Sequence, residues 1–136
     1  MMTTEDYVLI VDDDPDARKI MERILVGLGL SVQVAEDGRV ALDLIRSRKP
    51  ALILLDLMMP CMNGFEVLFH LRATPETRSI PIVVVSAVTQ NELLKLPGVS
   101  KVFRKAGMRV TDVQETVSSL LNKHQAQIET EAQKSA

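Results

Sequence analysis

Short apolar runs alternate along this chain with longer stretches in which apolar side chains recur every three or four residues. A short apolar run is typical of a buried strand, and the wider spacing is typical of a helix with one buried face. The runs predict five strands, at residues 7–11, 31–35, 52–55, 82–85 and 101–104. Helices are predicted between successive strands and after the last one, so strands and helices alternate in the expected fold.

Three of the predicted helices begin at a sequence signal for an N-terminal cap. Asp14 precedes Pro15, and proline suits the first turn of a helix because its missing amide hydrogen is not needed there. Asp37 stands at the start of the second helix. Asn63 is followed three residues later by Glu66, the spacing of a capping box.

The last third of the chain predicts one short helix and one long amphipathic helix. The short helix is expected from Thr89 to the Pro97-Gly98 pair, because that pair stops a helix. Beyond the apolar stripe of the final helix the sequence turns polar. We therefore predict a single domain at 6–123, followed at 124–136 by a polar tail that is either a frayed helix end or a linker.

Strands joined by single helices predict a parallel sheet, because a right-handed crossover connection needs the intervening helix. The runs at 7–11, 52–55 and 82–85 contain almost no polar residues, as expected for strands with both faces covered. The sequence thus predicts an α/β fold, a doubly wound five-stranded parallel sheet with helices on both faces. In such sheets the functional site lies at the carboxyl ends of the strands.

Composition excludes few functions but indicates the cellular environment in which the protein is expected. Hydrophobic residues make up 46% of the 136 residues and charged residues 25%, an ordinary balance for one globular domain. The net charge of −2 and the lack of a long apolar run predict no direct nucleic-acid binding and no membrane insertion. A single cysteine, Cys61, and an acidic N-terminus predict a protein of the reducing cytoplasm.

Charged and hydroxyl side chains follow several of the predicted strands directly. Asp12 and Asp13 end the first strand, Asp56 the third, Ser86 the fourth and Lys105 the fifth. Each residue alone is as well explained by a solvated turn. Together they predict one crevice with three acids, in which mutual repulsion raises a carboxylate pKa unless a cation is present. Carboxylates suit Mg²⁺, and an aspartate can also accept a phosphoryl group.

These residues resemble the receiver domains of two-component response regulators, in particular a single-domain regulator. The resemblance spans roughly residues 6–123. It rests on the following segments: Val11-Asp12-Asp13, Asp56-Leu57-Met58-Met59-Pro60, Met62-Asn63-Gly64, Ser86-Ala87 and Lys105. It implies a flavodoxin-like sheet with strand order 2-1-3-4-5 and a phosphoprotein that signals through phosphorelay, not a conventional enzyme.

The resemblance also implies a role for each site residue. Asp56 is the expected phosphoacceptor, taking the phosphoryl group from a histidine kinase or phosphotransfer protein. Asp13 and Asp56 are expected to ligate Mg²⁺ directly and Asp12 through water. The backbone carbonyl of Met58 is expected to be a further ligand. Ser86 and Lys105 are expected to contact the phosphoryl oxygens. The output is expected to be a downstream protein target.

The chain departs from the usual receiver pattern near the fifth strand. Ala106 stands where receivers usually have a proline, so we expect a trans peptide bond after Lys105. Val102 stands where the family has an aromatic switch residue, and Phe103 lies one position off, which reverses its face on a strand. The segment from Ser86 to Lys105 is also about three residues shorter than usual.

Two other functions are compatible with parts of this pattern. The altered fifth strand suits a receiver-like binding module whose output ignores phosphate. Asp12 and Asp14 have the two-residue spacing of haloacid-dehalogenase-like phosphatases, whose nucleophile is an aspartate. Pro15 and Asp16 then stand where a threonine or valine is needed, and the chain has no cap domain, so this second alternative is disfavoured.

Overall fold

The computed structural model describes residues 6–59, 62–87, 95–96 and 98–135. Strands and helices alternate through most of this length, as predicted. The strands are β1 (Val8–Val11), β2 (Val32–Ala35), β3 (Leu52–Leu55), β4 (Ile82–Ser86) and β5 (Val99–Arg104). The helices are α1 (Pro15–Gly27), α2 (Gly38–Ser47), α3 (Gly64–Ala73) and α4 (Val110–Ser135).

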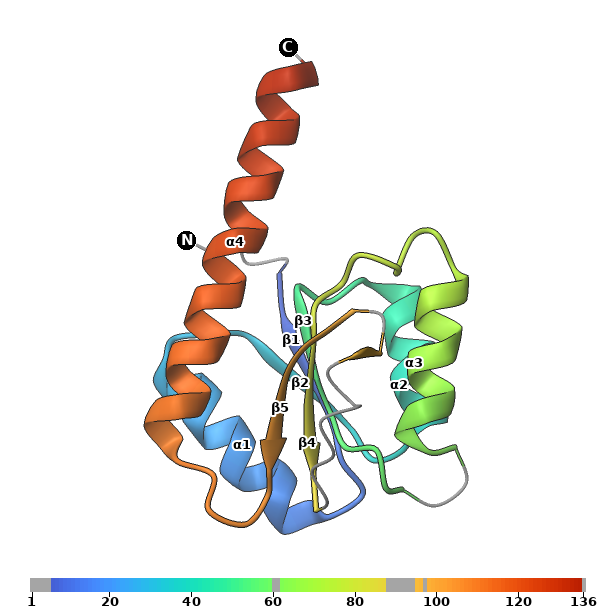
Figure 1. Ribbon diagram of the computed structural model, residues 1–136, viewed down its shortest axis with the longest axis vertical. Coiled ribbons are helices and arrows are strands. Elements are labelled where there is room, and N and C mark those ends of the chain that lie inside the picture. Colours follow the sequence, from blue (N-terminus) through green and yellow to red (C-terminus); the bar gives the residue numbers. More distant parts are fainter. Residues whose placement is uncertain (1–5, 60–61, 88–94, 97, 136) are drawn as a thin grey trace.

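The five strands form one sheet in the order β2-β1-β3-β4-β5, and all four neighbouring pairs are parallel. Helices α2 and α3 cover one face of the sheet, and α1 and α4 cover the other (Figure 1). This is the flavodoxin-like doubly wound architecture with the expected strand order. The central strands β1 and β3 are buried along their whole length, as their apolar runs predicted.

The three predicted caps are confirmed. The side chains of Asp14, Asp37 and Asn63 accept hydrogen bonds from the backbone amides of the following residues: Asp16, Val40 and Glu66. At its other end α1 is closed by Gly29, whose positive φ of 79° is a conformation that glycine adopts easily. The caps fix where α1 and α3 leave the edge of the sheet.

Strand β5 begins two residues earlier than predicted, and its pairing with β4 is irregular near that start. Ile82 pairs with Val99, whereas the next residue, Val83, pairs with Lys101. One residue of β5, Ser100, is therefore bulged out of the ladder. The pattern of apolar residues did not predict this bulge, because it depends on the neighbouring strand.

Helix α4 continues to Ser135, so the polar segment predicted as a frayed helix end or linker is helical up to that residue. In Figure 1 the second half of α4 projects beyond the sheet. Residues 89–94 and 97 of the expected short helix lie outside the described part of the chain. No helix of the described residues is both long and apolar enough to cross a bilayer.

Candidate functional site

The predicted acids meet at the carboxyl edge of the sheet. Asp12 and Asp56 directly follow the adjacent parallel strands β1 and β3, and the Asp56 amide donates to the Val11 carbonyl at 2.9 Å. Oxygens of Asp12, Asp13 and Asp56 all lie within 4.8 Å of one another. Asp12 and Asp56 are only 6% and 3% exposed, whereas Asp13 is open to solvent.

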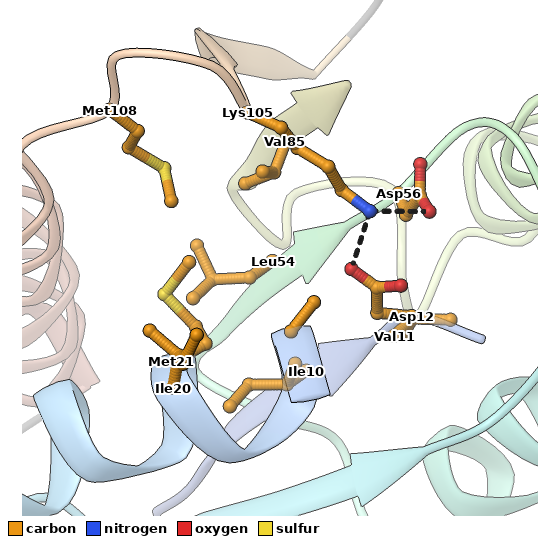
Figure 2. Close-up of a pocket in the computed structure, with 11 residues that line it drawn as sticks. Ile10, Val11, Asp12, Ile20, Met21, Leu54, Asp56, Val85, Lys105 and Met108 are labelled. Atoms are coloured by element: carbon orange, nitrogen blue, oxygen red, sulfur yellow. Dashed lines mark hydrogen bonds and ion pairs between the residues drawn. The ribbon is translucent and has the colours of Figure 1, made fainter. Parts of the chain in front are cut away.

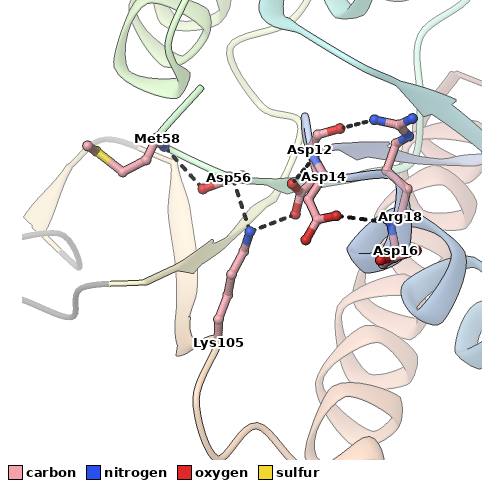
Figure 3. A network of polar contacts seen from close by, with 7 residues as sticks. All are labelled: Asp12, Asp14, Asp16, Arg18, Asp56, Met58 and Lys105. Atoms are coloured by element: carbon pink, nitrogen blue, oxygen red, sulfur yellow. Dashed lines mark hydrogen bonds and ion pairs between the residues drawn. The ribbon is translucent and has the colours of Figure 1, made fainter. Parts of the chain in front are cut away.

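Lys105 connects the two buried acids (Figure 3). Its Nζ lies 3.0 Å from Oδ2 of Asp12 and 3.2 Å from Oδ2 of Asp56. The Lys105 amide donates to the Ser86 carbonyl at 2.8 Å, which holds the residue beside the end of β4. The predicted convergence of the acids and the lysine is therefore confirmed.

The second oxygen of each buried acid accepts a backbone hydrogen bond. Oδ1 of Asp12 accepts from the Asp14 amide at 3.0 Å, and Oδ1 of Asp56 accepts from the Met58 amide at 3.1 Å. Both carboxylates are thus held at both oxygens, one by the backbone and one by Lys105. Such fixed acceptors need little rearrangement before they bind a cation or react.

The sequence did not point to Arg18. Its Nη1 donates to the backbone carbonyl of Asp12 at 2.7 Å, from the first turns of α1 (Figure 3). Asp12 is therefore contacted by Arg18 at its backbone and by Lys105 at its side chain. An arginine six residues after an aspartate is not a recognised sequence motif. Only the path of the β1–α1 loop brings the two residues together.

Burial raises the pKa of the Asp56 carboxyl above its ordinary value. The Met58 amide lowers this pKa, the Asp12 charge raises it, and Lys105 lowers it, but burial prevails. The raised pKa was predicted, although repulsion between the acids was wrongly expected to be its main cause. Burial lowers the pKa of Lys105, yet its hydrogen bonds and charge contacts with Asp12 and Asp56 raise it overall.

Gly64 allows α3 to start close to the Asp56 loop. A Cβ atom at this position would lie 2.4 Å from the carbonyl oxygen of Asp56 and 2.6 Å from the Cα of Leu57. Both are backbone atoms, which cannot move aside as a flexible side chain can. The glycine therefore permits this close approach.

The roles predicted for two further site residues, Ser86 and Met58, stay predictions. Ser86 is the last residue of β4 and is 3% exposed. The Met58 amide is directed at Asp56, and its side chain is 65% exposed. Met59 and Met62 pack on the α2–α3 side of the core. Cys61 lies outside the described residues.

The departures in β5 place the side chains of Val102 and Phe103 on opposite faces of the sheet. Phe103 is 8% exposed and belongs to the core beneath α1 and α4. Val102 packs against the core beneath α2 and α3. The prediction that the shift by one residue reverses the face of the aromatic ring is therefore confirmed. The peptide bond between Lys105 and Ala106 is trans, also as expected.

The donor set suits a small hard cation. Three carboxylates contribute oxygens within 4.8 Å of one another, and carboxylate oxygens are the ligands that Mg²⁺ prefers. Asp13 is exposed, so the cluster is open to water on one side, and Mg²⁺ usually keeps several water ligands. Lys105 balances part of the negative charge of the cluster.

Comparison with known proteins agrees with this geometry. The family model described as the response regulator receiver domain matches residues 8–96. Response regulator MprA of Mycolicibacterium vanbaalenii is 46% identical over 80 residues, which are 59% of this chain and 34% of that protein. DNA-binding response regulator MtrA of Mycolicibacterium smegmatis is 42% identical over 89 residues, 65% of this chain and 38% of that protein. The chain thus spans about a third of the length of these two relatives.

Solved structures show the same fold. Response regulator protein TrrA of Thermotoga maritima, solved in complex with Mg²⁺-BeF, superposes with a TM-score of 0.75 at 26% identity, over 85% of this chain and 98% of that one. The receiver domain of a putative Luxo repressor protein of Vibrio parahaemolyticus has a TM-score of 0.85 at 22% identity, over 93% and 98% of the two chains, and supports the fold alone. With the sequence match over most of the sheet and the acids and lysine converging at its edge, this chain belongs to the receiver domain family of two-component response regulators.

Proposed function

We propose that this receiver domain accepts a phosphoryl group on Asp56 in a Mg²⁺-dependent reaction. The observation that carries the proposal is the arrangement of three acid side chains within 4.8 Å of one another, with Lys105 contacting both buried ones. Asp12, Asp13, Asp56 and the Met58 carbonyl would hold the metal. When bound, Mg²⁺ supplies charge neutralisation for the incoming phosphoryl oxygens.

In the proposed transfer an Asp56 oxygen forms a bond to phosphorus, and the bond from phosphorus to the donor atom breaks. The electron pair of that bond leaves with the donor, a histidine nitrogen in the case of a kinase or phosphotransfer protein. Lys105 already lies 3.2 Å from Asp56, and its raised pKa keeps it positively charged at neutral pH. This position supports the proposal that Lys105 contacts a phosphoryl oxygen, with the Ser86 hydroxyl as the second proposed contact.

The proposed phosphodonor is a histidine kinase or phosphotransfer protein, and the proposed output is a protein partner in the cytoplasm. Direct nucleic-acid binding is not expected of this domain, because its net charge is −2. The relative MtrA is named a DNA-binding regulator, and this chain covers 38% of its length. The expectation therefore applies to the receiver alone.

Intact-protein mass spectrometry tests the proposal. The protein is incubated with Mg²⁺ and a small phosphodonor such as acetyl phosphate, and one phosphoryl adduct is expected. Asp56→Asn should remove the adduct and Asp13→Asn should weaken Mg²⁺-dependent labelling. Asp43→Asn, at an exposed acid on α2, is the matched control and should label normally. Unmodified wild-type protein, or an adduct that persists in Asp56→Asn, would refute the proposal.

A second candidate function is a binding module whose output does not respond to phosphate. It is favoured by Phe103, which is packed in the core beneath α1 and α4, and by Val102, which occupies the position of the aromatic switch. Partner affinity measured with and without beryllofluoride discriminates the two functions. A change of tenfold or more excludes the phosphate-independent module, and equal affinities support it.

A further inference from the structure

A pocket of about 250 Å³ adjoins the acidic cluster (Figure 2). Neighbouring strands β1, β3 and β4 each contribute an apolar side chain to its lining, and so do α1 and the loop before α4. Five of these apolar residues are Ile10, Leu54, Val85, Ile20 and Met108. Lys105, Asp12 and Asp56 line the same pocket, so it has an apolar body and a charged end.

The apolar part is large enough for an aromatic ring with a short chain. A cavity of about 150 Å³ already holds benzene in a protein core. Met21 and Met108 are flexible side chains that can adapt to a bound group. Ile20 lines the pocket yet is 57% exposed, so a ligand would cover apolar surface that otherwise faces water.

The charged end favours a cation over an anion. The carboxylates of Asp12, Asp13 and Asp56 outnumber the two nearby basic groups, Lys105 and Arg18. Lys105 already contacts both buried acids, so an anion would have to displace a carboxylate from it and then lie beside three acids. An ammonium group would have to share Asp12 or Asp56 with Lys105, whose charge repels it, but the three acids outnumber the two basic groups and leave a net attraction for a cation.

We propose that this pocket binds a small amphiphilic cation, namely a primary ammonium group on an apolar body about the size of a phenylethyl group. The ammonium contacts Asp12 and Asp56, and the body packs against the apolar side chains of β1, β3 and β4. Because those acids are also proposed metal ligands, the amine competes with Mg²⁺. This competition rests on the proposed function, whereas the pocket and its charge preference do not.

Amide NMR titration of the ¹⁵N-labelled protein in Mg²⁺-free buffer tests the pocket. The probes are 2-phenylethylammonium, the uncharged 2-phenylethanol and the anionic phenylacetate. We expect a Kd on the order of 1 mM for the ammonium, from the usual binding free energy per non-hydrogen atom of a small ligand. The alcohol and the carboxylate should bind at least tenfold more weakly. The amides of Ala17, Ile20 and Met108 should shift, because their residues line the pocket.

A matched pair of variants tests the location. Ala17→Phe fills the pocket from α1 without altering an acid, and should weaken the ammonium at least fivefold. Ala73→Phe makes the same change at an exposed position at the end of α3, on the other face of the sheet, and should leave the Kd unchanged. Equal binding of the alcohol and the ammonium, or an unchanged Kd in Ala17→Phe, would overturn the assignment.

Two further readouts separate this inference from the proposed function. Addition of 10 mM Mg²⁺ should raise the apparent Kd of the ammonium at least fivefold, and an unchanged Kd would overturn the competition. Asp56 labelling is measured on the same protein. Ammonium binding without Asp56 labelling would refute the phosphoacceptor function and support the proposed cation binding. Asp56 labelling with no preference for the ammonium would refute the cation binding alone.

Discussion

Lys105→Met should destabilise the protein in a way that depends on the two buried acids. The substitution keeps the apolar stem of the side chain and removes its ammonium group. In the wild type this group lies 3.0 Å from Asp12 and 3.2 Å from Asp56, whose side chains are only 9% and 3% exposed. Without it, two neighbouring carboxylates remain buried and have lost their shared counter-charge.

The size of the effect follows from the distances and the burial. Two opposite charges at 3.0 Å attract by about 5 kcal/mol at an effective dielectric constant of 20. Much of this is offset by the loss of hydration, and removal of one partner of a buried pair typically costs about 3–5 kcal/mol. The Lys105 side chain is 30% exposed, and water access reduces the expected loss to roughly 2–4 kcal/mol.

The loss should depend on pH. In the variant, burial and the Asp12 charge still raise the pKa of Asp56, and the lowering contributions of Lys105 are gone. The folded-state pKa is then further above the ordinary value of 3.8, so the folded state binds this proton more tightly than the unfolded state. The associated stability is present below pH 3.8 and is lost as pH rises through the raised pKa. The variant should therefore be closest to the wild type in acid.

Urea denaturation followed by circular dichroism at pH 7 and pH 5 measures both effects. Lys19→Met, at an exposed position on α1, is the matched control and should change stability by less than about 0.5 kcal/mol. In an Asp56→Asn background the loss caused by Lys105→Met should fall by at least about 1 kcal/mol, because one unpaired acid is removed. Wild-type stability of Lys105→Met at pH 7, or an equal loss in both backgrounds, would show that these ion pairs do not stabilise the fold.

Three further outcomes are expected. Gly64→Ala should destabilise the protein by more than about 2 kcal/mol and reduce Asp56 labelling, because the added Cβ would lie 2.4 Å from the backbone carbonyl oxygen of Asp56. The control Gly27→Ala, whose Cβ would have no atom within 4 Å, should be neutral or stabilising by up to about 1 kcal/mol in the same urea assay. Because burial raises the pKa of Asp56, metal-free wild-type protein should lose stability as pH rises from 3.8 through that raised value. Asp56→Asn should lack this pH-dependent loss of stability. Identical dependence of the melting temperature on pH in the wild type and Asp56→Asn would contradict the prediction. Mg²⁺ should raise the melting temperature of the wild type but much less that of Asp13→Asn, and equal shifts in calorimetry would argue against a metal site at this cluster.

The order of elements and the positions of the acids could be predicted from the chain itself. Buried parallel strands need continuous apolar runs, and helices that leave the sheet edge need caps such as Asp14 and Asn63. Because parallel strands end at the same edge, acids that directly follow 7–11 and 52–55 were expected at one edge, where they meet if the two strands are neighbours. The order 2-1-3-4-5 came from family resemblance, because apolar runs do not say which strands are neighbours.

Only the tertiary structure decided which groups touch and how deeply they are buried. The two contacts of Lys105, the hydrogen bond from Arg18 to Asp12 and the bulge in β5 each join segments whose separation in space is set by packing. Burial, and not repulsion between the acids, proved to be the first cause of the raised pKa of Asp56. Desolvation depends on the whole surrounding structure, whereas a sequence lists only the charges.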